Sequence, residues 1–241
     1  DMKIAACFSG VTRNFEDTYP YFKKNLFDQY DTDVFIYGSP NKYGMNYNLD
    51  KLNSLYNPQK VVLNDHTFYS ELDEQYNFKD PLGKMWYNAL GADNLRREYE
   101  TENKFEYDYV LKMRFDYFFL RTLEEVDIDL NQIDDDSVSI PYRWNFSQFH
   151  PKAKCDMFAI GTNKSMTRYC NLFNNIDKFL YSVPKNHRGS PHAESLLGVY
   201  LDSVRLNVIP TESPFEFEYP EEIDIGSNDV EYRANYRKFA F

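Results

Sequence analysis

Four short apolar segments in the N-terminal half constrain the fold more than any other feature of this chain. They are Lys3–Phe8, Asp33–Ser39, Lys60–Asp65 and Tyr109–Met113, and each ends in or is followed by small or polar residues. Apolar runs of this length, separated by segments with helical periodicity, are typical of buried parallel strands. We therefore expect an α/β fold in which residues 3–119 form a doubly wound, Rossmann-type half-sheet that binds a nucleotide.

Helical periodicity is present between these strands. Aromatic and leucine side chains recur on one helical face between positions 15 and 30, and Pro20 fits only near a first turn. A helix is therefore expected over Asp17–Tyr30, starting close to Thr18. A second helix is predicted over Leu82–Glu100, whereas the polar segment Asn41–Asn57 is predicted to be a loop with one helical turn.

The second half of the chain contains further strands and helices. The predicted strands are Ser137–Tyr142, Asp156–Thr162 and Val204–Pro210, and the predicted helices are Lys164–Ser182 and His192–Val204. The last thirty residues are acidic and aromatic, which is typical of a peripheral segment. Because there is no repeat and no flexible linker, we expect one domain over residues 1–241, with a nucleotide-binding half (3–119), a sheet-rich second half (120–210) and a peripheral tail (211–241).

Composition disfavours several classes of partner. The net charge of −11 disfavours nucleic acid, which rewards a basic surface, so no nucleic-acid partner is expected. No basic and apolar leader follows Met2 and no apolar run approaches the length of a membrane span. We therefore expect a soluble, cytoplasmic protein without an integral membrane segment. The three cysteines are far apart and form no CxxC pair, which favours buried thiols in a reducing compartment.

Charged and small residues at the ends of the first and fourth apolar segments are candidate ligand-binding residues. Arg114 and Asp116 follow the fourth segment, and residues two apart on a strand project to the same side. Because open α/β sheets bind ligands beyond the carboxyl ends of their strands, we expect this pair to meet a ligand there. The Ser9-Gly10 turn, together with Arg13, would hold a nucleotide by its phosphates or its base. Both groups also fit a simpler interpretation: a plain strand end and an ordinary strand-to-helix turn.

Five stretches of the sequence resemble one known family of enzymes. They read KIAACFSGVTRNFEDTYPYFKKNL, DVFIYGS, YDYVLKMRFDYFF, DMFAIG and PHAESLLGVYL, and they run from Lys3 to Leu201. Together they are similar to small GT-A-fold glycosyltransferases of bacterial surface-polysaccharide loci and large DNA viruses. The resemblance implies a GT-A-like single domain, a UDP- or GDP-sugar donor, and Mn²⁺ or Mg²⁺ held by an Asp-x-Asp. Here Asp116 matches the second, metal-binding Asp of that motif, and Arg114 stands in place of the first.

The resemblance further implies a transferase of hexosyl or deoxyhexosyl type, from a bacterium or a virus, acting on a glycan or glycoprotein acceptor. A divalent metal would stabilise the negative charge that develops on the departing diphosphate. Residues 120–210 would then form the acceptor half, with the aromatic loop Trp144–His150 as an acceptor platform or as core.

Three more candidate site residues lie in this acceptor half. Asp156 would hydrogen-bond hydroxyls of the donor sugar. Glu194 would serve as the base that an inverting transfer requires, or as a transition-state stabiliser. His192 would contact the metal or a phosphate. A simpler interpretation is open for each carboxylate, because Asp156 starts a strand and Glu194 lies in a first helical turn, where the helix dipole favours an acid.

Two other functional classes are compatible with the same residues. A nucleotidyltransferase or another nucleotide-using α/β enzyme would use a similar half-sheet, although the chain contains neither GxGxxG nor GxxxxGK[ST]. A non-catalytic carbohydrate-binding module would account for the 21 Tyr and 20 Phe residues. Turnover of a nucleotide-sugar separates these classes from the glycosyltransferase.

Overall fold

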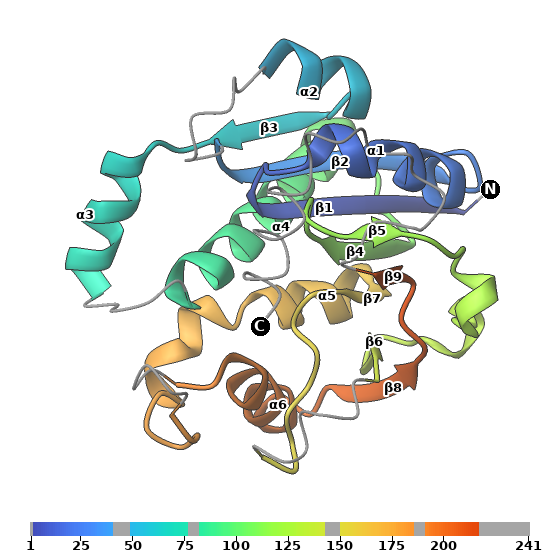
Figure 1. Ribbon diagram of the computed structural model, residues 1–241. Helices are drawn as coiled ribbons and strands as arrows, with labels where there is room; N and C mark the ends of the chain where they lie inside the picture. The colour runs from blue at the N-terminus through green and yellow to red at the C-terminus, as the bar shows by residue number, and fades with distance from the viewer. Residues whose placement is uncertain (1, 41–48, 77–81, 143–149, 186–190, 217–241) are drawn as a thin grey trace, which may run out of the picture.

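A single seven-stranded sheet organises the computed structural model, which describes residues 2–40, 49–76, 82–142, 150–185 and 191–216 (Figure 1). The strand order is β3-β2-β1-β4-β7-β6-β8. All neighbouring strands run parallel except β7, which is antiparallel to both β4 and β6. The expected α/β fold with a mostly parallel sheet is therefore confirmed. The strands are β1 (Lys3–Val11), β2 (Asp31–Ser39), β3 (Lys60–Leu63), β4 (Tyr109–Met113), β6 (Ser137–Pro141), β7 (Ala159–Thr162) and β8 (Asn207–Thr211).

Helices cover both faces of the sheet. In β1, Cys7 contacts the carbonyl oxygen of Ala92 in α4, whereas the neighbouring Phe8 packs its ring against Phe22 in α1. Because neighbouring strand residues point to opposite faces, α1 and α4 lie on opposite sides of β1. The described helices are α1 (Phe15–Phe22), α2 (Leu49–Tyr56), α3 (His66–Tyr76), α4 (Leu82–Asn103), α5 (Asn163–Cys170) and α6 (Ala193–Ser203), and short strands β5 (Phe118–Phe119) and β9 (Phe215–Glu216) pair separately.

An aromatic cluster joins α1, α2 and the central strands. The Phe8 ring lies 5.0 Å from Phe22, 5.3 Å from Tyr56 and 4.8 Å from Phe115, measured between ring centroids. Each of these rings is buried. Buried aromatic side chains of this kind contribute strongly to core stability because each removes a large apolar area from water. Much of the high aromatic content is therefore core.

Several predicted boundaries differ from the structure. Helix α1 begins at Phe15 rather than near Thr18, so Pro20 lies inside it, and a π-helical turn (Lys23–Phe27) continues it. Proline lacks an N–H and clashes with the preceding turn, which disturbs the regular α-helical hydrogen bonding. The predicted 164–182 helix divides into α5 and a 3₁₀ segment, Phe173–Lys178. Helix α2 is longer than the single turn expected, and α3 was not predicted.

A buried charged network fastens α4 to α5 and to the start of β4. The Arg96 guanidinium is fully buried and donates to Asp93 (2.6 Å and 3.0 Å), to Glu100 (2.7 Å) and to the hydroxyl of Thr167 in α5 (2.8 Å). Glu100 also accepts a hydrogen bond from the backbone N–H of Tyr107, at 2.9 Å. A buried guanidinium is tolerated only when it is paired in this way.

Candidate functional site

Two arginines from neighbouring strand ends meet on Asp116. Arg13 follows β1 and donates from Nε to Asp116 Oδ2 at 3.0 Å, and its Nη2 bonds the same oxygen. Arg114 follows β4 and donates from Nε to Oδ1 at 2.8 Å and from Nη2 to Oδ2 at 2.5 Å. β4 ends at Met113, so Arg114 and Asp116 lie beyond the strand and the expected strand alternation does not apply to them. Their side chains nevertheless meet in an ion pair, and Arg13, 103 positions away, bonds the same carboxylate.

Burial and charge hold this cluster in one ionisation state. Asp116 is 6% exposed, whereas the side chains of Arg13 and Arg114 are 31% and 27% exposed. Burial alone would raise the pKa of Asp116, but the positive charges of Arg114 and Arg13 outweigh that effect and lower it to about 2. Asp116 is therefore ionised throughout the physiological pH range.

Contacts with α1 and with the π-helical turn that follows it fix the segment that carries Asp116. The Thr18 hydroxyl donates to the carbonyl oxygen of Phe115 at 2.9 Å, and the Asn25 amide donates to that of Phe119 at 2.6 Å. Phe115, Tyr117, Phe118 and Phe119 are all fully buried. Asp116 therefore lies on a rigid backbone, and the arginines are positioned by it.

The arrangement of Asp116 does not suit a metal ion. Both carboxylate oxygens accept arginine hydrogen bonds, and a divalent ion bound there would lie beside two guanidinium cations. Two unit charges 4 Å apart repel by about 4 kcal/mol at an effective dielectric constant of about 20, and a divalent ion doubles that cost. Within the described ranges, no group of three His, Cys, Asp or Glu side chains is placed to hold a metal. The expectation of Mn²⁺ or Mg²⁺ stays a prediction.

Ser9 and Gly10 were expected to form a strand-to-helix turn, but β1 continues through them to Val11, so both residues pair with β2. Ser9 is buried, and its hydroxyl donates weakly to the carbonyl oxygen of Met113, at 3.5 Å, so it joins the ends of β1 and β4. Gly10 has φ +106°, a conformation that other residues rarely adopt. A Cβ added at Gly10 would meet no atom of the described chain within 4 Å.

Close backbone packing between Gly10 in β1 and Gly38 in β2 leads to a first prediction. A Cβ at Gly38 in β2 would lie 1.8 Å from the carbonyl oxygen of Gly10, so Gly38→Ala must separate β1 from β2. We expect it to lower the free energy of unfolding by about 3 kcal/mol, at the upper end of overpacking effects. Gly10→Ala is the matched variant, because it adds strain in open space and should cost only about 1 kcal/mol. Equal effects in chemical denaturation would contradict this packing.

Asp156, His192 and Glu194 belong to the segment before β7 and to the start of α6. The negative charge of Asp156 acts to raise the pKa of both Arg114 and His192. Burial has the larger effect on His192 and lowers its pKa, so the imidazole is neutral at pH 7. His192 Nδ1 caps α6 by accepting from the N–H of Ser195 at 3.3 Å, and its Nε2 lies 3.4 Å from Glu194. The fold thus gathers predicted residues from β1, β4, the segment before β7 and the start of α6.

Lys112 is a residue of this site that the sequence did not identify as functional. It is 1% exposed in the middle of β4, and its ammonium group donates to the backbone carbonyl oxygen of Asp156. The ammonium lies 5.7 Å from the ring centroid of Trp86, and burial lowers the pKa of Lys112. Lys112 therefore holds the backbone at Asp156. The sequence feature that could have identified Lys112 is its position as a lysine inside an otherwise apolar strand.

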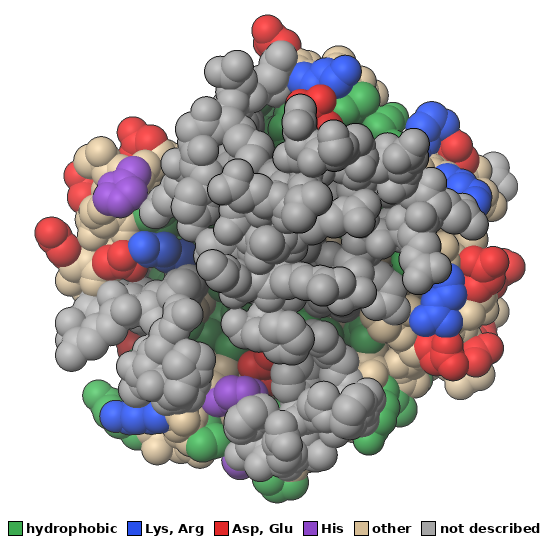
Figure 2. All heavy atoms as spheres, viewed as in Figure 1, with side chains coloured by type: hydrophobic (Ala, Val, Ile, Leu, Met, Phe, Trp, Pro, Cys, Tyr) green, Lys and Arg blue, Asp and Glu red, His purple; other side chains and the backbone are tan. Residues whose placement is uncertain are grey.

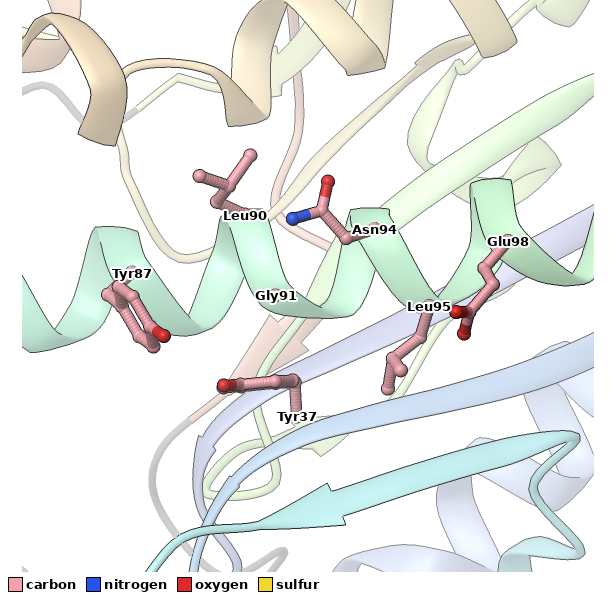
Figure 3. Close-up of a pocket in the computed structure, with 7 residues that line it drawn as sticks. All are labelled: Tyr37, Tyr87, Leu90, Gly91, Asn94, Leu95 and Glu98. Carbon is pink, nitrogen blue, oxygen red and sulfur yellow. The ribbon is translucent and has the colours of Figure 1, made fainter. Parts of the chain in front are cut away.

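A separate groove lies between β2 and α4 (Figure 3). Its volume is about 220 Å³, and none of its lining residues was predicted to be functional. In the close-up, the Tyr37 ring lies flat beneath Gly91 of α4, while Asn94 and Glu98 project from the same helix. A Cβ at Gly91 would come within 2.5 Å of that ring, so the glycine permits this contact. Packing alone explains Gly91.

Some predicted features cannot be placed. Residues 143–149 of the proposed acceptor platform, and 217–241 of the tail, lie outside the described residues.

On the face in Figure 2, the acidic and basic side chains of the described residues are interspersed along the rim. The expectation that nucleic acid is not a partner stays a prediction.

Comparison with known proteins adds no identification. No model of a known protein family matches the chain, and no curated protein matches it significantly. Across the described helices, none is long and apolar enough to cross a membrane.

Proposed function

We propose that this protein is a glycosyltransferase that moves a sugar from a UDP- or GDP-sugar to a hydroxyl group of a glycan or glycoprotein. The observation that supports this most is the meeting of Arg13, Arg114 and Asp116 between β1 and β4. From β1 the chain adds β2 and β3 on one side of the sheet and then β4 on the other, so the strand order reverses between β1 and β4. Open α/β sheets bind ligands at such a reversal. The GT-A-like fold and the cytoplasmic location remain part of the proposal.

Several of the candidate site residues have a role in this reaction. Arg13 and Arg114 contact the donor diphosphate. Asp156 orients hydroxyls of the donor sugar. The acceptor oxygen forms a bond to the anomeric carbon while the bond from that carbon to the diphosphate oxygen breaks, and the nucleoside diphosphate leaves with the electron pair. In an inverting transfer, Glu194 takes the proton of the acceptor hydroxyl.

The test is nucleotide release from a panel of UDP- and GDP-sugars, each with Mn²⁺, Mg²⁺ or EDTA. We expect slow release of nucleoside diphosphate from one donor. Glu194→Gln should lower the rate roughly 100-fold or more, since a general base contributes about that much. Glu98→Gln is the matched control, because Glu98 is exposed on α4 and lines the other groove.

The products distinguish the alternatives. Release of pyrophosphate from a nucleoside triphosphate would support a nucleotidyltransferase, and sugar binding without turnover would support a carbohydrate-binding module. No release of UDP or GDP from any donor, with glycan acceptors present, would contradict the proposed function.

A further inference from the structure

We infer that the two guanidinium groups of Arg13 and Arg114 form the diphosphate site themselves, and that the nucleotide binds there without a divalent metal. This inference rests on the proposed function and departs from the metal-dependent scheme that the Asp-x-Asp resemblance implies. It assigns to Asp116 a positioning role instead of a metal-binding one.

The hydrogen bonds of the cluster leave donors for a ligand. Each arginine uses Nε and Nη2 to bond Asp116. Among the described residues, neither Nη1 group has an acceptor, although a guanidinium has five N–H donors. The two side chains are 31% and 27% exposed, so both guanidinium groups are partly open to solvent. Guanidinium groups suit phosphate oxygens through paired, charge-assisted hydrogen bonds.

The buried carboxylate makes this pair of cations possible. Two adjacent guanidinium groups repel each other, and Asp116 between them offsets that repulsion while it fixes both planes. Two arginines and one carboxylate leave a net charge of one positive unit, which complements a polyanionic diphosphate. The anion therefore meets donors that are already oriented and does not have to order them on binding.

The position of Arg114 explains why a metal is unnecessary. Where an Asp-x-Asp would offer two carboxylates, this chain has one carboxylate and one guanidinium, a change of two charge units toward positive. Such a site attracts the diphosphate directly and repels a metal ion.

Isothermal titration of the full chain with UDP and with GDP tests the inference. We expect the same Kd in EDTA and in Mn²⁺ or Mg²⁺, within about threefold. Arg13→Gln and Arg114→Gln should each weaken binding in EDTA roughly 10- to 100-fold, the effect of losing a charge-assisted hydrogen-bonded contact. Arg97→Gln, an exposed arginine on α4, should leave the Kd unchanged. Thermal melting confirms that each variant is folded, and the comparison in EDTA needs no variant.

The outcomes separate this inference from the proposed function. Nucleotide binding that requires Mn²⁺ or Mg²⁺ would overturn the inference and leave the glycosyltransferase proposal standing. If neither nucleotide binds under any condition, the proposed function fails, and inorganic pyrophosphate in EDTA becomes the probe. Pyrophosphate binding that both arginine variants lose would sustain the anion site, and absence of pyrophosphate binding would overturn it.

Discussion

Asp116→Asn is expected to abolish measurable nucleotide binding and to lower the free energy of unfolding by about 3 kcal/mol. The substitution removes the only negative charge that we find between Arg13 and Arg114 in the described chain. Removing one partner of a buried ion pair costs about 3–5 kcal/mol, and the partial exposure of both arginines places this case at the lower end. For a chain of this size, that loss lowers Tm by roughly 6–12 °C.

Acid unfolding provides a second readout of Asp116. Because its pKa is lowered in the folded state, its contribution to stability is present above about pH 4. That contribution is lost as the pH falls toward the folded-state pKa of about 2. The asparagine variant should lack this component of the acid transition. Asp28→Asn is the control, since Asp28 forms a half-exposed pair with Lys23 and should change stability by less than about 1 kcal/mol. Full nucleotide binding by Asp116→Asn would contradict the role given to the carboxylate.

Arg96→Leu is expected to destabilise the fold by about 4 kcal/mol without changing the nucleotide site. Leucine leaves Asp93 and Glu100 with uncompensated negative charge in the interior, and breaking such a network costs about 3–5 kcal/mol. The links from α4 to Thr167 and, through Glu100, to Tyr107 are weakened at the same time. Chemical denaturation measures the loss, and Tm should fall by roughly 10 °C.

The neighbouring arginine supplies a matched control for this variant. Arg97 lies on the same helix but is exposed, so Arg97→Leu should change the free energy of unfolding by less than about 0.5 kcal/mol. At a temperature where Arg96→Leu remains folded, its affinity for UDP or GDP should equal that of the unchanged protein. A loss of affinity in folded Arg96→Leu would show that the network and the nucleotide site are coupled.

The central strands and half of the candidate site could be predicted because they depend on local patterns. The apolar runs that became β1, β2 and β4 are short and end in small or polar residues. Arg114 and Asp116 were expected to act together as strand residues, but they meet each other in the segment after β4, where strand alternation no longer applies. Helix α3 was missed because, over its described side chains 66–75, only Tyr69 and Leu72 are buried, which leaves a weak apolar pattern.

The contacts that decide the chemistry of the site are long-range and carry no local signal. Arg13 and Asp116 are 103 residues apart, and Lys112 and Asp156 are 44 apart. The local sequence around a carboxylate that follows a strand is the same whether the carboxylate binds a metal or two arginines. The expected metal role of Asp116 rested on the resemblance, and the salt bridge from Arg13 to Asp116 forms only when β1 and β4 pair.

A crystal structure of the chain soaked with UDP- and GDP-sugars tests the central claim most directly. We predict an ordered donor at the ends of β1 and β4, with its diphosphate hydrogen-bonded to Arg13 and Arg114 and its sugar beside Asp156. A donor that lies instead in the groove under Gly91, or leaves both arginines without a phosphate contact, would contradict the account.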